Sequence, residues 1–194
     1  MSKPFGALPP SAFQERVRAF ASHLPVNYFG RKSASLLLGP AGGRSRQAFD
    51  VTVFGSQKAR LHPFDNICEK RVYLTPQFWD QAERAFLGDL ISGFSDRSFN
   101  FVDVGANVGL YTFFARAEAK RAGATFKAAC IEADPEMAAR LRFNVDASNA
   151  AAEISVLNCA ASDTSARLPF SVNRKSRGLS RIDESGEVTI AARP

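Results

Sequence analysis

The sequence predicts an α/β fold built around a parallel sheet. From residue 98 onward, short buried runs alternate with amphipathic segments, which is the pattern of strand–helix–strand units. The chain has 194 residues, enough for one domain with an appended arm. Hydrophobic residues make up 45% of it and charged residues 23%, which is typical of a globular protein and excludes disordered, collagen-like and coiled-coil chains.

The segment 1–97 is predicted to form an N-terminal arm of helices and short antiparallel strands. Ser11 and Gln14 have the spacing of a capping box, so we expect a helix there that ends before Pro25. The stretch 33–47 is Gly-rich and basic, and we interpret it as a linker, with a phosphate-attracting loop as the alternative. The period of two in FDVTVF, KARLHP and KRVYL then predicts two or three short strands.

A second helix of the arm is predicted after these strands. Thr75 and Pro76 are typical of an N-cap and a first helical residue. The apolar residues that follow recur at helical spacing, so one face of this helix is expected to pack on another element. That face comprises Phe78, Trp79, Ala82, Phe86 and Leu90.

The segment 98–194 is predicted to hold the sheet. Strands are expected at FNFVDV, TFKAACIE and EISVLNCA, joined by a helix that ends near Gly123 and a helix that begins at Asp134 and Pro135. RLPFSV and EVTIAA predict two further short strands. Between them lies a basic loop, which we interpret as a solvated charge run rather than a phosphate or nucleic-acid site. Its basic residues are Arg174, Lys175, Arg177 and Arg181.

Composition argues against several classes of protein. No apolar stretch approaches the roughly 18–20 residues of a membrane span, and the first residues lack the apolar centre of a secretory signal, so we expect a cytoplasmic location. Cys68, Cys130 and Cys159 form no C-x-x-C pair, and we expect reduced thiols. The histidines, His23 and His62, form no zinc motif, and no metal site is expected. A net charge of +6 suits anionic partners.

The most informative motif lies where the first strand of the parallel sheet turns into a helix. Asp103, Gly105, Asn107 and Gly109 form the pattern D-x-G-x-N-x-G. Ligands bind at the carboxyl ends of parallel strands, where glycines let the backbone approach them closely. The acid argues against a pyrophosphate in this loop and favours a ligand with a cationic portion. The alternative is structural: the acid satisfies backbone groups and the glycines permit a tight turn.

Two further acids follow the next strands. Glu132 ends the second strand, where an acid typically accepts hydrogen bonds from ribose hydroxyls, although it could also be a solvated strand-end acid. Asp163 lies on the loop after the third strand, where a carboxylate could accept from an exocyclic amine. Three strand ends would then meet at one nucleoside. S-adenosylmethionine combines an adenosine with a charged amino acid and a positive sulfonium, so it is the expected cofactor.

The same residues resemble a known family. FVDVGANVGLYT, CIEADPEMAARLRFNV and ISVLNCAASDTSARLPF look like the FkbM family of S-adenosylmethionine-dependent methyltransferases, and the resemblance covers residues 72–190. It implies a Rossmann-like class I methyltransferase fold with a doubly wound, mostly parallel sheet. It also implies that the glycine-rich motif holds the methionine and ribose portions of the cofactor, that Glu132 binds the ribose and that Asp163 lies near the adenine.

The family resemblance also implies the reaction. The expected activity is O-methylation of a hydroxyl on a sugar, polyketide or related metabolite, so the partner would be a small-molecule or glycan acceptor. The sequence does not identify the general base, and His62 is not expected to serve as one. The alternatives are an RNA methyltransferase, which would use the net charge but lacks an N-P-P-Y-like tetrapeptide, and a non-catalytic cofactor-binding or interaction module. A nicotinamide-dependent enzyme would require the glycine spacing G-x-G-x-x-G, which differs from the D-x-G-x-N-x-G of this chain.

The resemblance is incomplete at its C-terminal end. The family continues, after a strand like that at 188–192, into a further strand and a loop of the type I-K-I-D-V-E-G, and nothing similar occurs before Pro194. We therefore expect an incomplete parallel sheet in this chain, and a fragment or truncated product is the corresponding hypothesis.

Overall fold

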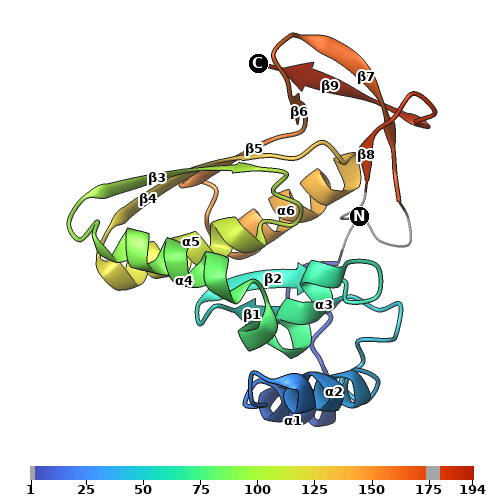
Figure 1. Ribbon diagram of the computed structural model, residues 1–194, viewed down its shortest axis with the longest axis vertical. Helices are drawn as coiled ribbons and strands as arrows, with labels where there is room; N and C mark the ends of the chain where they lie inside the picture. Colours follow the sequence, from blue (N-terminus) through green and yellow to red (C-terminus); the bar gives the residue numbers. More distant parts are fainter. Residues whose placement is uncertain (1–2, 174–179) are drawn as a thin grey trace.

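The structure, a computed structural model, describes residues 3–173 and 180–194 (Figure 1). Along its longest axis lie, in order, a pair of N-terminal helices, an antiparallel strand pair with a helix, the parallel sheet with its helices, and a small C-terminal sheet. Three residues of the predicted basic loop, Arg174, Lys175 and Arg177, lie outside the described residues. No helix in the described part of the chain has the length and apolar character needed to cross a membrane.

The predicted α/β class is confirmed by a three-stranded parallel sheet. Its order is β3–β4–β5, formed by β3 (Ser98–Val104), β4 (Thr125–Ile131) and β5 (Ile154–Leu157). Two helices make the crossovers between these strands: α5 (Leu110–Ala122) and α6 (Pro135–Ala147). The carboxyl ends of the three strands therefore meet at one edge of the sheet.

Both crossover helices have the ends that the sequence predicts. The Asp134 side chain accepts hydrogen bonds from the backbone N–H groups of Glu136 and Met137, and Pro135 is the first helical residue of α6. Gly123 ends α5 in the left-handed conformation, with φ of 73°. The predicted buried stripe of α6 is also confirmed, since Met137, Leu141 and Val145 are all buried.

The parallel sheet has one covered and one exposed face. Helix α5 packs against β3 and β4, and α6 packs against β5. Side chains alternate across a strand, so Phe99 and Phe101 of β3 turn toward these helices while Val102 and Val104 face away from them. Val102 and Val104 of β3 and Leu157 of β5 are exposed on the face that these helices leave uncovered.

The N-terminal arm packs against this layer of helices. Strands β1 (Phe49–Val53) and β2 (Gln57–Leu61) form the predicted antiparallel pair. Strand β2 lies along α6, where the backbone N–H of Arg60 donates to Oδ1 of Asn144 at 2.7 Å. One continuous hydrophobic core contains residues of the arm and of the sheet, so the proposed boundary at residue 97 does not divide the core.

The two N-terminal helices confirm one prediction and overturn another. Helix α1 (Ala12–Ala21) begins with the predicted capping box, in which the Ser11 hydroxyl accepts from the Gln14 N–H. The linker predicted at 33–47 is wrong for its first part, because Ser33 to Leu37 belong to helix α2 (Tyr28–Leu37). Asn27 caps this helix by accepting from the Gly30 N–H at 3.0 Å, and the glycines that suggested a linker follow the helix end.

The third predicted strand, KRVYL, is also wrong. These residues lie in helix α3 (Ile67–Leu74), which Asn66 caps by accepting from the N–H groups of Cys68 and Glu69. Val72, Tyr73 and Leu74 are buried in succession. A short apolar run of this kind is compatible with a strand or a buried helix, and the cap selects the helix.

The helix predicted from Thr75 begins later than expected. A short 3₁₀ turn at Pro76–Phe78 comes first, with no side-chain cap from Thr75, and α4 (Gln81–Ser92) starts after Asp80. Asp80 has φ of 37°, which breaks the helical phase between the two segments. As a result Leu87 and Ile91 are buried, whereas Phe86 and Leu90 of the predicted face are exposed.

Within residues 160–173 and 180–194, the C-terminal sheet has four strands in the order β6–β9–β7–β8. They are β6 (Ala160–Ala161), β7 (Ala166–Ser171), β8 (Arg181–Ile182) and β9 (Val188–Arg193). Strands β7 and β9 confirm the predictions at RLPFSV and EVTIAA. Ala160, Phe170, Ile190 and Ala192 form a small core of their own, separate from the main core.

Candidate functional site

The predicted motif forms the turn between β3 and α5. Gly105, Asn107 and Gly109 all have positive φ, at 77°, 52° and 87°. The backbone N–H groups of Gly105 and Ala106 both donate to the carbonyl oxygen of Ile131, at 2.8 and 3.1 Å, which holds the turn against the end of β4. The turn and the end of the neighbouring strand therefore form one surface, as the sequence predicts.

A cavity of about 330 Å³ lies at this edge of the sheet. Gly105, Asn107 and Glu132 line it, so three of the six predicted site residues are brought together. A Cβ atom at Gly105 would meet no other atom within 4 Å, which means that the backbone here faces open space. The C-terminal sheet and the residue before β8 supply the opposite side of the cavity with Phe170, Ser180, Arg181 and Ile182.

Glu132 is the acidic group of the cavity. Its side chain accepts two backbone hydrogen bonds, from Asn107 N–H to Oε2 at 2.7 Å and from Asp134 N–H to Oε1 at 2.8 Å. The residue is only 8% exposed, and burial raises the pKa of its carboxyl above the usual value. A carboxylate can accept about four hydrogen bonds, so Glu132 retains acceptor capacity toward a ligand hydroxyl.

Asn158 fixes the backbone beside Glu132. Its side-chain amide donates to the carbonyl oxygens of Glu132 and Ala133, at 2.8 and 3.1 Å. Because Asn158 directly follows β5, the end of that strand holds the chain that leaves β4. The carboxylate is thus positioned by groups from all three strand ends.

Asp103 does not line the cavity. Its carboxylate faces α5, where Oδ2 accepts from the Thr112 hydroxyl at 2.6 Å, and burial raises its pKa. Side chains alternate along β3, so Val104 lines the cavity and Asp103 lies on the opposite face of the strand. The Asp103 carboxylate therefore does not face the cavity, and its position does not support the prediction that it attracts a cationic ligand.

Gly109 and Asp163 also lie outside the cavity lining. A Cβ atom on Gly109 would collide with the side chain of Leu141, so this glycine permits α6 to pack against the start of α5. Asp163 is exposed on the loop after β6, where its Oδ1 accepts from the Ser162 hydroxyl at 3.3 Å.

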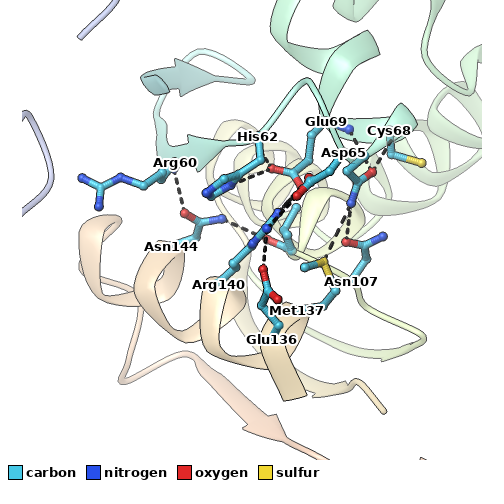
Figure 2. A network of polar contacts seen from close by, with 12 residues as sticks. Arg60, His62, Asp65, Cys68, Glu69, Asn107, Glu136, Met137, Arg140 and Asn144 are labelled. Atoms are coloured by element: carbon cyan, nitrogen blue, oxygen red, sulfur yellow. Dashed lines mark hydrogen bonds and ion pairs between the residues drawn. The ribbon is translucent and has the colours of Figure 1, made fainter. Parts of the chain in front are cut away.

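Asn66 is a site residue that the sequence did not reveal. Its side-chain amide donates to Oδ1 of Asn107 at 2.8 Å and lies 4.0 Å from the sulfur of Met137 (Figure 2). Asn66 comes from the N-terminal arm, where it caps α3, and a cap signal in the sequence predicts a helix start but not a contact with Asn107. The arm therefore reaches the loop that forms the cavity.

A second polar network joins α3 to α6 (Figure 2). The fully buried Glu69 accepts from the backbone N–H of His62 at 2.6 Å, and Arg140 of α6 approaches its Oε1 at 3.5 Å. Arg140 also donates to Asp65 at 2.9 Å and to Glu136 at 2.6 Å, and these partners raise its pKa. These hydrogen bonds and ion pairs connect the arm to the sheet helix α6.

Comparison with known proteins gives likenesses of structure alone. No family model and no curated protein sequence matches this chain. An S-adenosylmethionine-dependent methyltransferase from Agrobacterium tumefaciens is 12% identical, with a TM-score of 0.38 over 57% of this chain and 32% of that one. A methyltransferase FkbM from Methylobacillus flagellatus is 16% identical, with a TM-score of 0.37 over 93% of this chain and 37% of that one.

The chain thus spans about a third of the length of these two structures. A tRNA methyltransferase from M. jannaschii is 15% identical, with a TM-score of 0.38 over 62% of this chain and 34% of that one. Identities and TM-scores of this size do not assign a function.

Proposed function

We propose that this chain binds S-adenosylmethionine in the strand-end cavity and takes part in methyl transfer to a hydroxyl oxygen of a small molecule or glycan. The observation that carries the proposal is the pairing of a buried acceptor, Glu132, with the open backbone of Gly105 in one cavity. Its volume of about 330 Å³ lies within the range of small-molecule sites. When bound, the cofactor would supply a methyl group activated on a sulfonium.

Glu132 is the residue that we assign to the ribose hydroxyls. Two backbone N–H groups hold its carboxylate, so the side chain needs no rearrangement to accept further hydrogen bonds. Hydrogen bonds to a charged group that is already oriented are stronger than neutral ones. Gly105 gives the ligand access to the backbone of the turn, because no side chain fills the space beside it.

Asp103, Gly109 and Asn66 are positioning residues in this proposal. The Asp103–Thr112 hydrogen bond connects the end of β3 to the first turns of α5, on either side of the cavity loop. Gly109 permits close packing of that helix on α6, and Asn66 holds the side chain of Asn107. Asp163 lies outside the cavity lining, so the adenine contact implied by the family resemblance stays a prediction.

The contribution of the protein to such a reaction is mainly geometric. The donor is already activated, so the chain must hold the acceptor oxygen in line with the methyl group, and a base must take the hydroxyl proton. We assign the FkbM type from the motif residues that line the cavity, Gly105, Asn107 and Glu132. No residue is assigned as the base.

Calorimetric titration with S-adenosylhomocysteine and, separately, with NAD tests the cofactor. We expect one site for S-adenosylhomocysteine and no heat with NAD; binding of NAD alone would contradict the proposal. Transfer of a labelled methyl group to sugars and small hydroxyl compounds, with RNA as the comparison, tests the acceptor. Incorporation into RNA alone would replace the hydroxyl acceptor by a nucleic acid, and binding without transfer would indicate a non-catalytic module.

A further inference from the structure

The positive charge of the protein is concentrated in its N-terminal segment. Residues 1–47 contain seven Lys and Arg against a single Glu, which accounts for the whole net charge of +6. The remaining 18 basic and 18 acidic residues, at 48–194, balance one another. The segment therefore presents a strong positive potential, while the rest of the chain is neutral overall.

The same segment exposes large apolar side chains. Phe13 and Phe20 of α1 are 64% and 63% exposed, and Phe29 and Leu36 of α2 are 75% and 76% exposed. Val26, between the helices, and Tyr28, the first residue of α2, are exposed as well. Groups of exposed apolar side chains of this size, next to polar ones, are typical of interaction surfaces in globular proteins.

The two helices carry the same pattern on their exposed faces. In α1 an aromatic residue is followed by a basic residue three positions later and an apolar residue seven positions later: Phe13, Arg16, Phe20. In α2 the corresponding residues are Phe29, Lys32 and Leu36. Residues at these spacings lie along one face of a helix. We call these six side chains the N-terminal patch.

Other faces of both helices already pack against the protein. Ala21 of α1 and Ala34 of α2 are buried, and the two helices contact each other. The pair lies at one end of the molecule, away from the parallel sheet (Figure 1). The N-terminal patch is therefore not required by the core, and it lies where an extended partner could reach it without obstruction from the sheet.

We propose that the N-terminal patch docks the protein on the surface of an anionic phospholipid membrane. A bilayer surface accepts aromatic and aliphatic side chains at the level of its headgroups and attracts Lys and Arg with its negative lipids. The long stems of Arg16 and Lys32 can lie along the apolar residues while their charged ends reach lipid phosphates. The proposal is independent of the proposed methyltransferase function.

Charge and chemistry favour the bilayer over two other partners. A second copy of the chain would bring two positive surfaces together, and the segment has one acidic residue, Glu15, to compensate. A nucleic acid would match the charge, but phosphates would leave exposed side chains such as Phe29 and Leu36 without an apolar environment. Of these three partners, the anionic bilayer offers both an apolar environment and negative charge.

Docking at this end would not bring the cavity to the lipid. The cavity lies between the parallel sheet and the C-terminal sheet, whereas α1 and α2 lie at the other end of the longest axis (Figure 1). The membrane would therefore hold the protein in place without presenting lipid headgroups to the cavity.

Co-sedimentation of the full chain with vesicles tests the proposal. We expect binding to phosphatidylcholine vesicles that contain about 30% phosphatidylserine and much weaker binding to phosphatidylcholine alone. The double variants Phe13→Ser/Phe29→Ser and Arg16→Gln/Lys32→Gln should each lose about tenfold or more in partitioning. All four side chains are on exposed helix faces, so melting temperatures should stay close to that of the wild type.

Matched controls come from exposed residues elsewhere. Phe86→Ser on α4 removes an equally exposed aromatic ring, and Lys120→Gln/Arg121→Gln on α5 removes two exposed charges; both should bind vesicles like the wild type. Equal losses in the controls and in the patch variants would overturn the proposal. A protein that does not bind anionic vesicles would also overturn the proposal. In that case, binding to a single-stranded RNA would indicate a nucleic-acid partner, and self-association that the patch variants abolish would indicate a second copy of the chain.

Discussion

Two buried glutamates in neighbouring parts of the molecule have different surroundings. Glu69 is fully buried, and its carboxylate meets the His62 backbone N–H and the Arg140 guanidinium. Glu132 accepts from two backbone N–H groups and borders a cavity of about 330 Å³. The first carboxylate is enclosed by protein groups, whereas the second still faces open space.

This difference separates a structural acid from a candidate binding acid. Burial and hydrogen bonding alone do not distinguish the two, because both are nearly inaccessible and both accept backbone hydrogen bonds. What distinguishes Glu132 is the empty space shared with Gly105. Changes around Glu69 should therefore affect folding, and changes around Glu132 should affect ligand affinity.

The largest expected effect comes from removing Arg140. The substitution Arg140→Met leaves the Glu69 carboxylate buried without its guanidinium, which should cost about 3–5 kcal/mol in the free energy of unfolding. Urea denaturation measures the loss. Arg121→Met is the control, because Arg121 is exposed and pairs with Glu118 on the surface, and it should cost less than about 1 kcal/mol. Equal losses of unfolding free energy in the two variants would show that the buried Arg140–Glu69 pair contributes no more to stability than a surface ion pair.

The two glycines of the loop should respond differently to alanine. Gly109→Ala forces a Cβ atom against Leu141 at a positive φ, so we expect a loss of about 2–4 kcal/mol in the free energy of unfolding. Gly105→Ala has open space and should lose only about 1–2 kcal/mol, from backbone strain. Calorimetry should show the reverse order for cofactor affinity in the folded proteins. A stability loss at Gly105 as large as at Gly109 would mean that the space beside Gly105 is not open.

The smallest effect is a pH dependence at Asp103. Burial raises the pKa of this carboxyl above 3.8, so its contribution to stability is fully present below about pH 4 and is lost as the pH rises through the raised value. The variant Asp103→Asn cannot ionise. Its stability relative to the wild type should therefore increase from about pH 4 to about pH 7 in thermal melts. A difference that is constant with pH would show that the pKa of Asp103 is not raised.

Local signals in the sequence identify most of the central elements. Asp134 and Pro135 predict the start of α6, and Gly123 predicts the end of α5, because caps depend on nearby backbone groups. The strand predicted at KRVYL is a helix that Asn66 caps, and the linker predicted at 33–47 is wrong only as far as Leu37, because a short run of this kind is compatible with more than one structure. Among the site residues, spacing alone could not show which side of β3 carries Asp103.

The site also contains residues that are far apart in the sequence, and no local sequence pattern predicts their contacts. Asn66 reaches Asn107 across 41 positions, and Phe170 and Ile182 come from the C-terminal sheet. Contacts of this kind depend on how separate elements pack, so they become visible only in the folded structure. The strand-end motif predicts where the cavity lies, and the packing determines which side chains enclose it.

The affinity of Glu132→Gln for S-adenosylhomocysteine tests the central claim most directly. A hydrogen bond to a charged group contributes about 1.5–3 kcal/mol, so calorimetry should show a loss of about 10- to 100-fold relative to the wild type. Asp89→Asn, an exposed change on α4, is the control and should bind like the wild type. Unchanged affinity in a folded Glu132→Gln variant would contradict the assignment of this cavity as the cofactor site.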